Sequence, residues 1–294
     1  MRSLARRHPL AVFLAIAYGA SAAIFALPLL SLAGIGVINL DLPGVAPFVL
    51  LDTFALAGAA FVTTALAEGR SGVRELRRRV FNFRVNPGWY ALAILLLPVA
   101  AMATAILVGG IDVLVAIVGD PVTVLATIAV GSLLAFALVN LWEEAAWTGF
   151  ALERLQPRLG PIGASVVTTW LQALVHVPLV FVVGGVTVGR VPAEQIPFYL
   201  VALFVLPIPV RIALTWLYNG SGRSVPIVGL AHAGLGVASG VALIPVVAPA
   251  VDPVWVYAGF AAVAAVILVA TRGSLGYEGT ARSVRTGGEV AVAA

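Results

Sequence analysis

Stretches of about twenty apolar residues recur along this chain, and they constrain its fold more than any other feature. A helix needs roughly 20 mostly apolar residues to cross the hydrocarbon core of a bilayer. Windows of that kind cover residues 10–37, 46–67, 89–108, 122–147, 162–183, 197–218, 225–247 and 254–270. The sequence therefore predicts an all-α, polytopic membrane protein with about eight transmembrane helices.

The composition leaves no room for a large soluble domain. Of the 294 residues, 61% are hydrophobic and only 10% are charged, whereas a soluble domain averages about 25% charged residues. We expect residues 1–272 to form a single transmembrane domain, whose first helix is retained rather than cleaved as a signal peptide. Residues 273–294 are rich in Gly, Ser and Arg and are expected to be a disordered cytoplasmic tail. The absence of cysteine excludes disulfides, iron–sulfur clusters and thiol nucleophiles.

The arginines supply an orientation for these helices. All seventeen basic residues are arginine, and fifteen of them fall in the terminal segments and in every second connection. Arg190 alone lies in the alternate connections, and Arg211 lies within a span. By the positive-inside rule both termini are cytoplasmic, which fits a bacterial inner membrane. The net charge of +4 is therefore ascribed to topology, and no nucleic-acid partner is expected.

Ionisable residues inside predicted spans are functional candidates, because a charge at bilayer depth costs several kcal/mol. They are Glu143, Glu144, His176, Arg211 and His232. Two of the three histidines in the chain are therefore intramembrane. Asp52, at the start of the second span, is expected to lie at the membrane interface.

The connection between the fourth and fifth spans brings two of these candidates to the same depth. The helix is expected to continue through Gln156 and to turn near residue 159 or 160, between Pro157 and Pro161. Glu143 lies sixteen or seventeen residues before this turn, and His176 lies the same distance after it. Both residues are then ~20–25 Å from the turn in an antiparallel hairpin.

A carboxylate facing an imidazole can hold a water molecule and accept its proton. Burial suits the carboxylate for general-base catalysis, and a second imidazole, His232, can stabilise an oxyanion. Arg211 is expected to be the counter-ion of one glutamate, the alternative being that it snorkels to the cytoplasmic side. Asn140, one turn before Glu144, is expected in the same cavity. Zinc is the alternative, because two Glu and two His can ligate it, although no HExxH motif is present.

Three segments resemble the motifs of the CPBP family, the CAAX prenyl-protease-like and bacteriocin-processing intramembrane glutamic proteases. The first is EEAAWTGFALERLQ from Glu143, the second is LVHVP around His176, and the third runs from Trp216 to Ala233. These motifs define a core over residues 122–247. The resemblance implies about eight helices and a cavity open to the cytoplasmic side. It also implies that Glu143 and His176 activate water, that Glu144 supports the site, and that His232 helps to form the oxyanion hole.

Three positions depart from the family pattern. Thr148 stands where the family usually has Arg, Gln172 where it has an aromatic residue, and Gly236 where it has Asn. The Asn would be the other half of the oxyanion hole, and losing one such donor typically costs ~10²–10³ in rate. Gln172, one turn before His176, and Ser239, two turns after His232, are possible substitutes.

The sequence therefore predicts a metal-independent intramembrane endopeptidase that needs no cofactor and acts on a peptide or membrane-protein substrate. The alternative is a catalytically degenerate relative that serves as a binding, immunity or scaffold protein, which the three departures would explain. A proton-coupled transporter is disfavoured because no internal repeat is visible.

Overall fold

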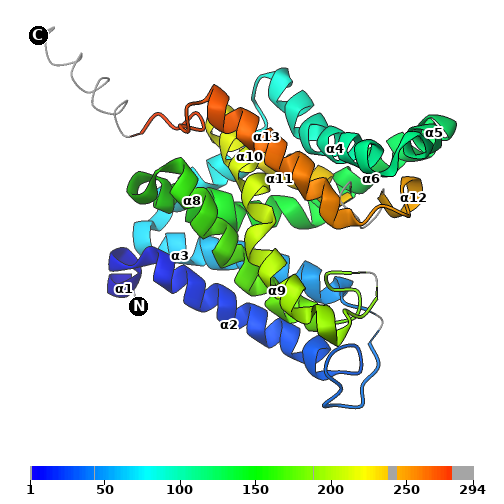
Figure 1. The fold of residues 1–294 in the computed structure, drawn as a ribbon. Coiled ribbons are helices and arrows are strands. Elements are labelled where there is room, and N and C mark those ends of the chain that lie inside the picture. Colours follow the sequence, from blue (N-terminus) through cyan, green and yellow to red (C-terminus); the bar gives the residue numbers. More distant parts are fainter. Residues whose placement is uncertain (1, 43, 188, 238–243, 280–294) are drawn as a thin grey trace, which may run out of the picture.

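The computed structural model describes residues 2–42, 44–187, 189–237 and 244–279, and within these ranges the chain forms helices and connections but no strand (Figure 1). The predicted all-α architecture is confirmed. The α-helices are α1 Arg2–Arg7, α2 Pro9–Leu30, α3 Ala46–Val80, α4 Pro87–Gly109, α5 Ile111–Gly119, α6 Pro121–Ala135, α7 Leu141–Ala146, α8 Glu153–His176, α9 Ile196–Val205, α10 Pro207–Gly220, α11 Val225–Gly236, α12 Ile244–Val247 and α13 Val256–Ala270.

Five helical stretches in the described residues are long and apolar enough to cross a membrane: Pro9–Leu30, Ala46–Val80, Pro87–Gly109, Pro121–Phe181 and Ala193–Gly220. The 61-residue stretch is interrupted at Gly160, whose φ of 67° is a left-handed conformation that favours glycine. The two arms then lie side by side, because Arg211 contacts both Thr148 and Gln172. With the shorter apolar helices α11 and α13, the predicted polytopic arrangement is reproduced, including the turn near residue 160.

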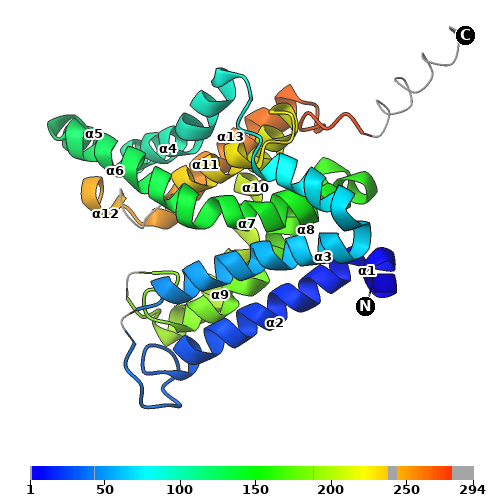
Figure 2. The same ribbon diagram turned by 180° about the vertical axis from the view of Figure 1, so that it is seen from behind.

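The helices that carry the candidate residues lie in the middle of the molecule. Figures 1 and 2 show α2, α3 and α9 on one side of the molecule and α4, α5, α6 and α13 on the other, with α7, α8, α10 and α11 between them. Helix α7 packs on α3 and α11, while α10 packs on α8, α11 and α13. Trp147 and Phe150 are fully buried and contact the ring of Phe13 at centroid distances of 5.6 and 4.8 Å. Large aromatic side chains thus fill the space around the paired glutamates.

The first span ends earlier than its apolar window predicts. Helix α2 stops at Leu30, and the Ser31 hydroxyl donates a 2.8 Å hydrogen bond to the Pro28 carbonyl. Residues 31–37 form turns, which Arg190 contacts through a 2.6 Å hydrogen bond to the Gly34 carbonyl. Apolar composition alone could not show this boundary, because the turn residues are as hydrophobic as the helix.

One end of the molecule collects the arginine-rich segments. Helix α1 and the residues after α13 lie at this end, opposite the connection between α2 and α3 (Figure 1). Glu153, at the start of α8, pairs with Arg79 and Arg223 at 3.3 Å each and accepts a 2.8 Å hydrogen bond from Tyr218. This network joins the distal part of α3 to α8 and to the end of α10.

The predicted disordered tail, 273–294, falls mostly outside the described residues, which end at 279. Within the tail, residues 273–279 are described, and they form turns. Leu275 is fully buried, and its carbonyl accepts a 3.1 Å hydrogen bond from Asn219. At least this first part of the tail is therefore packed against α10.

Candidate active site

Two π-helical turns flank the paired glutamates, where the sequence predicts a regular helix. They are Phe136–Asn140 and Trp147–Leu152, on either side of the single α-helical segment α7. Such turns insert an extra residue and are frequent at functional sites. The second one contains Gly149, where an added Cβ would lie only 3.2 Å from Leu76 and 3.3 Å from Val225. A larger residue at position 149 would therefore push the side chains of Leu76 and Val225 away by a few tenths of an ångström.

Glu143 and Glu144 serve different parts of the molecule. Adjacent residues of an α-helix project about 100° apart. Glu144 points toward α10 and α11, where Arg211 and His232 bind it. Glu143 is 6% exposed and interacts electrostatically with Asp52 of α3. Two consecutive acids thus supply one carboxylate to each of two neighbouring helix interfaces.

Glu144 is the centre of a complete hydrogen-bond network. Arg211 pairs with it through both terminal nitrogens, Nη1 to Oε2 at 2.7 Å and Nη2 to Oε1 at 3.0 Å. The Thr148 hydroxyl also donates to Oε2, and His232 Nδ1 lies 2.8 Å from Oε1. Each carboxylate oxygen therefore has two partners, which uses its usual capacity. Glu144 is fully buried, and full pairing is what a buried charge requires.

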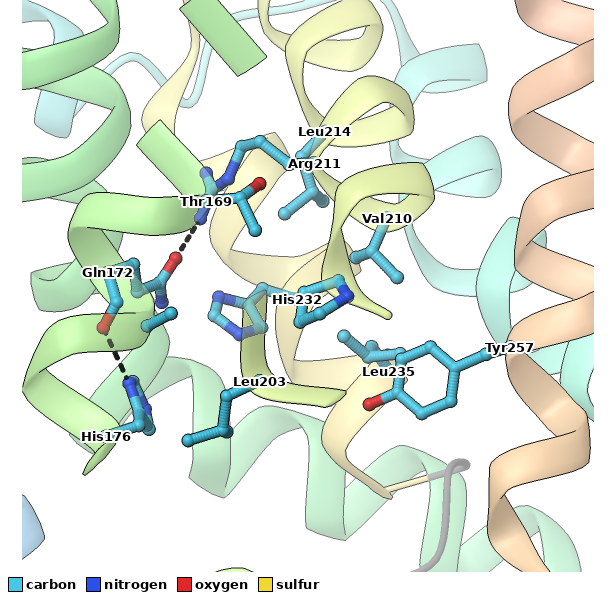
Figure 3. A pocket seen from close by; sticks show the side chains of 12 residues that line it. Thr169, Gln172, His176, Leu203, Val210, Arg211, Leu214, His232, Leu235 and Tyr257 are labelled. Atoms are coloured by element: carbon cyan, nitrogen blue, oxygen red, sulfur yellow. Dashed lines mark hydrogen bonds between the residues drawn. The ribbon is translucent and has the colours of Figure 1, made fainter. Parts of the chain in front are cut away.

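Arg211 connects this carboxylate to α8. Its Nη1 also donates a 3.0 Å hydrogen bond to the Thr148 hydroxyl, and its Nη2 donates to the side-chain oxygen of Gln172 (Figure 3). The guanidinium is 3% exposed, so it does not snorkel to the surface. The expected counter-ion role of Arg211 is observed, with Glu144 as its partner. Because the Gln172 oxygen is occupied, its amide NH₂ is left to donate elsewhere.

His232 is oriented by Glu144. Since an ionised carboxylate only accepts hydrogen bonds, the bond to Glu144 places a proton on Nδ1 of His232. The ring also lines the cavity shown in Figure 3. Its Nε2 can therefore accept a hydrogen bond when the ring is neutral and donate one when the ring is an imidazolium.

His176 is oriented by the backbone. It is the last residue of α8, and its Nδ1 lies 3.0 Å from the Gln172 carbonyl one turn earlier. A carbonyl only accepts, so Nδ1 carries the proton and Nε2 of the neutral ring holds a free lone pair. Pro178 follows two residues later, where a tighter helical turn, Val177–Phe181, replaces the α-helix. The helix end thus presents a proton acceptor to the cavity.

A cavity of about 200 Å³ joins these side chains. One wall is polar and contains Thr169, Gln172, His176, Arg211 and His232 (Figure 3). The rest of the wall is largely apolar, formed by Ala173, Leu203, Pro207, Val210, Leu214, Leu235 and Tyr257. A water molecule takes about 30 Å³ in the liquid, so the volume suits several waters or a peptide group with a side chain.

Two predicted site residues lie outside this cavity, and a third cannot be placed because it falls outside the described residues. Glu143 does not line this cavity, although it and His176 both interact electrostatically with Asp52. Asn140 is buried in the first π-helical turn and does not line the cavity either. Ser239 lies outside the described residues. The structure therefore gathers Glu144, Gln172, Arg211 and both histidines, and it places Glu143 behind them on the α3 side.

Sequence reasoning missed the burial of Asp52. It was expected at the membrane interface, a depth that stays a prediction, and the structure adds that Asp52 is only 4% exposed within the protein. The available signal was a carboxylate six residues into an apolar helix. Within the described residues, no group of three or more His, Cys, Asp or Glu side chains is arranged to hold a metal ion.

Comparison with known proteins finds a family likeness in the part of the chain that carries the site. The sequence profile described as type II CAAX prenyl endopeptidase Rce1-like matches residues 125–238. This match supports the resemblance of these residues to the CPBP family of CAAX-protease-like membrane proteins. No curated protein matches the chain.

The matched residues contain most of the site. They run from α6 to the end of α11 and include the paired glutamates, His176, Arg211 and His232. The family is one of membrane proteases, so the cavity with its two oriented imidazoles lies in the part of the chain that carries the family likeness. Asp52 and Tyr257 lie outside the matched residues.

Proposed function

We propose that this protein is a metal-independent intramembrane endopeptidase that hydrolyses a peptide bond with an activated water molecule. The observation that carries this proposal is the pair of imidazoles, His176 and His232, that line one cavity while each is held through Nδ1 by a protein acceptor. Fixed ring orientation is what general acid–base and oxyanion roles require.

In the proposed first step, Glu143 and His176 together activate the water. The water's O–H bond breaks, its proton goes to this pair, and the oxygen forms a bond to the carbonyl carbon of the substrate. His176 is suited to contact the water, because its free lone pair lies at the cavity wall. Glu143 acts from the α3 side and shares the proton taken from the water.

The carbonyl oxygen becomes an oxyanion in this step, and we assign its stabilisation to His232 and Gln172. His232 donates from Nε2 in its imidazolium form, which the Glu144 carboxylate supports. Gln172 donates from its NH₂, because Arg211 occupies its oxygen. Collapse of the intermediate breaks the C–N bond, and the proton moves to the leaving nitrogen. Glu144 is thus a positioning residue, with no lone pair left for the substrate.

Cleavage of a reporter peptide by purified protein tests these roles. We expect Glu143→Gln and His176→Ala each to lower kcat by about 10²–10⁴, while chelators have no effect. Asp112→Asn, an exposed acid in α5, is the matched control and should retain full activity. Full activity in both site variants would overturn the proposed roles, and loss of activity with chelators would favour the zinc alternative.

The second candidate function is a binding or scaffold protein without catalysis, which the substitution of Gly236 for the family Asn favours. An added Cβ at Gly236 meets no heavy atom within 4 Å of the described residues, so the first side-chain atom of an Asn has room there. In an active protease that already uses Gln172, Gly236→Asn should raise kcat by about tenfold. Cleavage by Gly236→Asn but none by the wild-type protein would favour the degenerate protein instead.

The proposal also covers the domain, its orientation in the membrane and the class of substrate. Residues 1–272 act as one membrane domain with its core at 122–247, and no cofactor is needed. The arginine-rich end, which holds α1 and the residues after α13, is proposed to face the cytoplasm. Access of the substrate to the cavity from the cytoplasmic side is part of the same proposal. The membrane is the bacterial inner membrane, and the substrate is a peptide or a membrane protein.

A further inference from the structure

The distal part of α3, residues 70–80, is a separate helix that begins where the span ends. Gly69 has φ 69° and ψ −154°, a non-helical conformation at which α3 changes direction. Figure 2 shows the cyan part of α3 turned away from the blue part that precedes it. That first part, residues 46–68, is about 34 Å long at 1.5 Å per residue, which exceeds the hydrocarbon thickness of ~30 Å. We therefore expect the distal part of α3 to begin at the level of the lipid headgroups.

One face of the distal part of α3 packs against the protein. Leu76 and Val80, one turn apart, are buried, and an added Cβ at Gly149 would lie 3.2 Å from Leu76. Arg79 also points inward, because it donates a 3.3 Å hydrogen bond to the Gly149 carbonyl and lies 3.3 Å from Glu153. The apolar side of this helix is therefore occupied by the turn that follows the paired glutamates.

The exposed face of the same helix is basic. Arg70, Arg74 and Arg77 follow one another at intervals of four and three residues, which places them on one side of the helix. All three are exposed, and none has an ion pair or a side-chain hydrogen bond within the ranges that the structure describes. Arg78, next to them, differs because Glu75 pairs with it at 2.8 Å. Three arginines on one face are thus left free to bind an external anion.

The composition of this face favours a lipid surface as its partner. Residues 70–84 contain six arginines and one glutamate, so their charge is complementary to anionic headgroups. Phe81 and Phe83, directly after the helix, are 49% and 45% exposed, and aromatic side chains of this kind enter the boundary between headgroups and acyl chains. Orientation in the bilayer requires basic residues near the helix ends, but it does not require them on one face. The helical spacing of these arginines therefore points to a surface that they form together.

We propose that the exposed face of the distal part of α3, with Arg70, Arg74 and Arg77 at its centre, is a docking surface for anionic phospholipid headgroups. The guanidinium groups bind the phosphates of lipids in the leaflet where the span ends, since Arg matches phosphate geometry. The lipids hold this helix from outside, while Leu76 and Arg79 contact the turn after the paired glutamates from inside. This binding does not depend on whether the chain is a protease.

The test uses the absence of cysteine from the chain. Ser71→Cys, an exposed position on the distal part of α3, carries a donor fluorophore in the full-length protein, reconstituted into phosphatidylcholine vesicles. Energy transfer is measured to a trace of phosphatidylglycerol with an acceptor on its acyl chain, and separately to phosphatidylcholine labelled in the same way. We expect about fivefold or greater enrichment of the anionic lipid at the donor. The excess should vanish at about 1 M salt, where exposed charges are screened.

Two triple variants separate this surface from the general charge of the molecule. Combining Arg70→Gln, Arg74→Gln and Arg77→Gln should bring the enrichment close to one, and Gln forms helix about as well as Arg. The matched control removes the same charge from three exposed arginines outside this surface, Arg2→Gln, Arg6→Gln and Arg158→Gln. It should keep most of the enrichment. Replacing the three surface arginines by Lys should also keep it, because the positive charge is retained.

The outcomes that would overturn the docking surface are distinct from those that concern catalysis. Equal transfer to both lipids in the wild type would overturn it, as would an equal loss of enrichment in the two Gln variants. An unenriched wild type that instead binds a poly-glutamate peptide through the same arginines would identify an acidic protein segment as the partner. If the surface Gln variant does not fold, the salt dependence of the wild type still decides. Inactive protein that enriches the anionic lipid would refute the protease and keep the docking surface.

Discussion

The guanidinium that pairs with Glu144 comes from Arg211 of α10, and not from position 148 on the same stretch of helix as Glu144. Position 148 is one turn after Glu144 on the same helix face, where an arginine would pair with that carboxylate. Here the residue is a threonine, and the guanidinium comes from α10 instead, with hydrogen bonds to both Thr148 and Glu144. The departure from the family motif at position 148 is therefore accompanied by a charge that restores the pairing of Glu144.

This arrangement predicts how the stability of the protein changes when the arginine is moved from position 211 to position 148. Arg211→Met leaves Glu144 buried and unpaired, which should cost about 3–5 kcal/mol of stability and lower the temperature of unfolding in detergent. Adding Thr148→Arg to Arg211→Met should recover much of this loss, because the new arginine takes the vacated space. Thr148→Arg alone should be destabilising, since Arg211 already fills the site. A double variant no more stable than Arg211→Met would contradict the interpretation.

At the scale of the element, the helix connections were more predictable than the helix faces. The turn between the fourth and fifth spans follows from Pro157, Gly160 and Pro161, whose local conformational preferences are strong. The π-helical turns around α7 had no comparable signal. They depend on the packing of α3 and α11 against Gly149, which involves residues distant in the sequence.

Gly160 offers a test of the turn itself. Its φ of 67° with ψ of 172° is a conformation open almost only to glycine, while an added Cβ meets no heavy atom within 4 Å. Gly160→Ala should therefore destabilise the protein by about 1–3 kcal/mol through backbone strain alone. Gly58→Ala is the control, because Gly58 also has open space but lies in regular helix, where alanine is favoured. Thermal unfolding of both variants in detergent measures the difference, and equal stability would refute the strain.

For the whole molecule, hydrophobic length predicted the all-α polytopic arrangement. The motifs pointed to several of the residues that meet, such as Glu144 and His232. Neither could show how each helix is rotated about its axis, because uniformly apolar helices such as α2 and α4 have no polar face. That rotation decides that Glu144 rather than Glu143 binds Arg211, that Glu143 stands behind the cavity, and that Asp52 faces inward. The missing information was therefore the packing of one helix on another.

The absence of cysteine allows a direct test of the orientation. Val37, 67% exposed in the connection between α2 and α3, should lie outside the cell, whereas exposed Ser71 in the distal part of α3 should lie in the cytoplasm. In intact spheroplasts a membrane-impermeant thiol reagent should label Val37→Cys at once. It should label Ser71→Cys only after permeabilisation. The reverse pattern would place the arginine-rich end outside and refute the proposed topology.

The saturated pairing of Glu144 restricts which walls of the cavity are able to move. Sliding α10 or α11 relative to α7 would break bonds from Arg211 or His232 to a fully buried carboxylate. Helices α9 and α13 contribute Leu203 and Tyr257 to the cavity, and the described Glu144 network includes no residue from them. Widening that admits a polypeptide and keeps both the ion pair and the bond from Arg211 to Gln172 of α8 therefore requires displacement of α9 or α13.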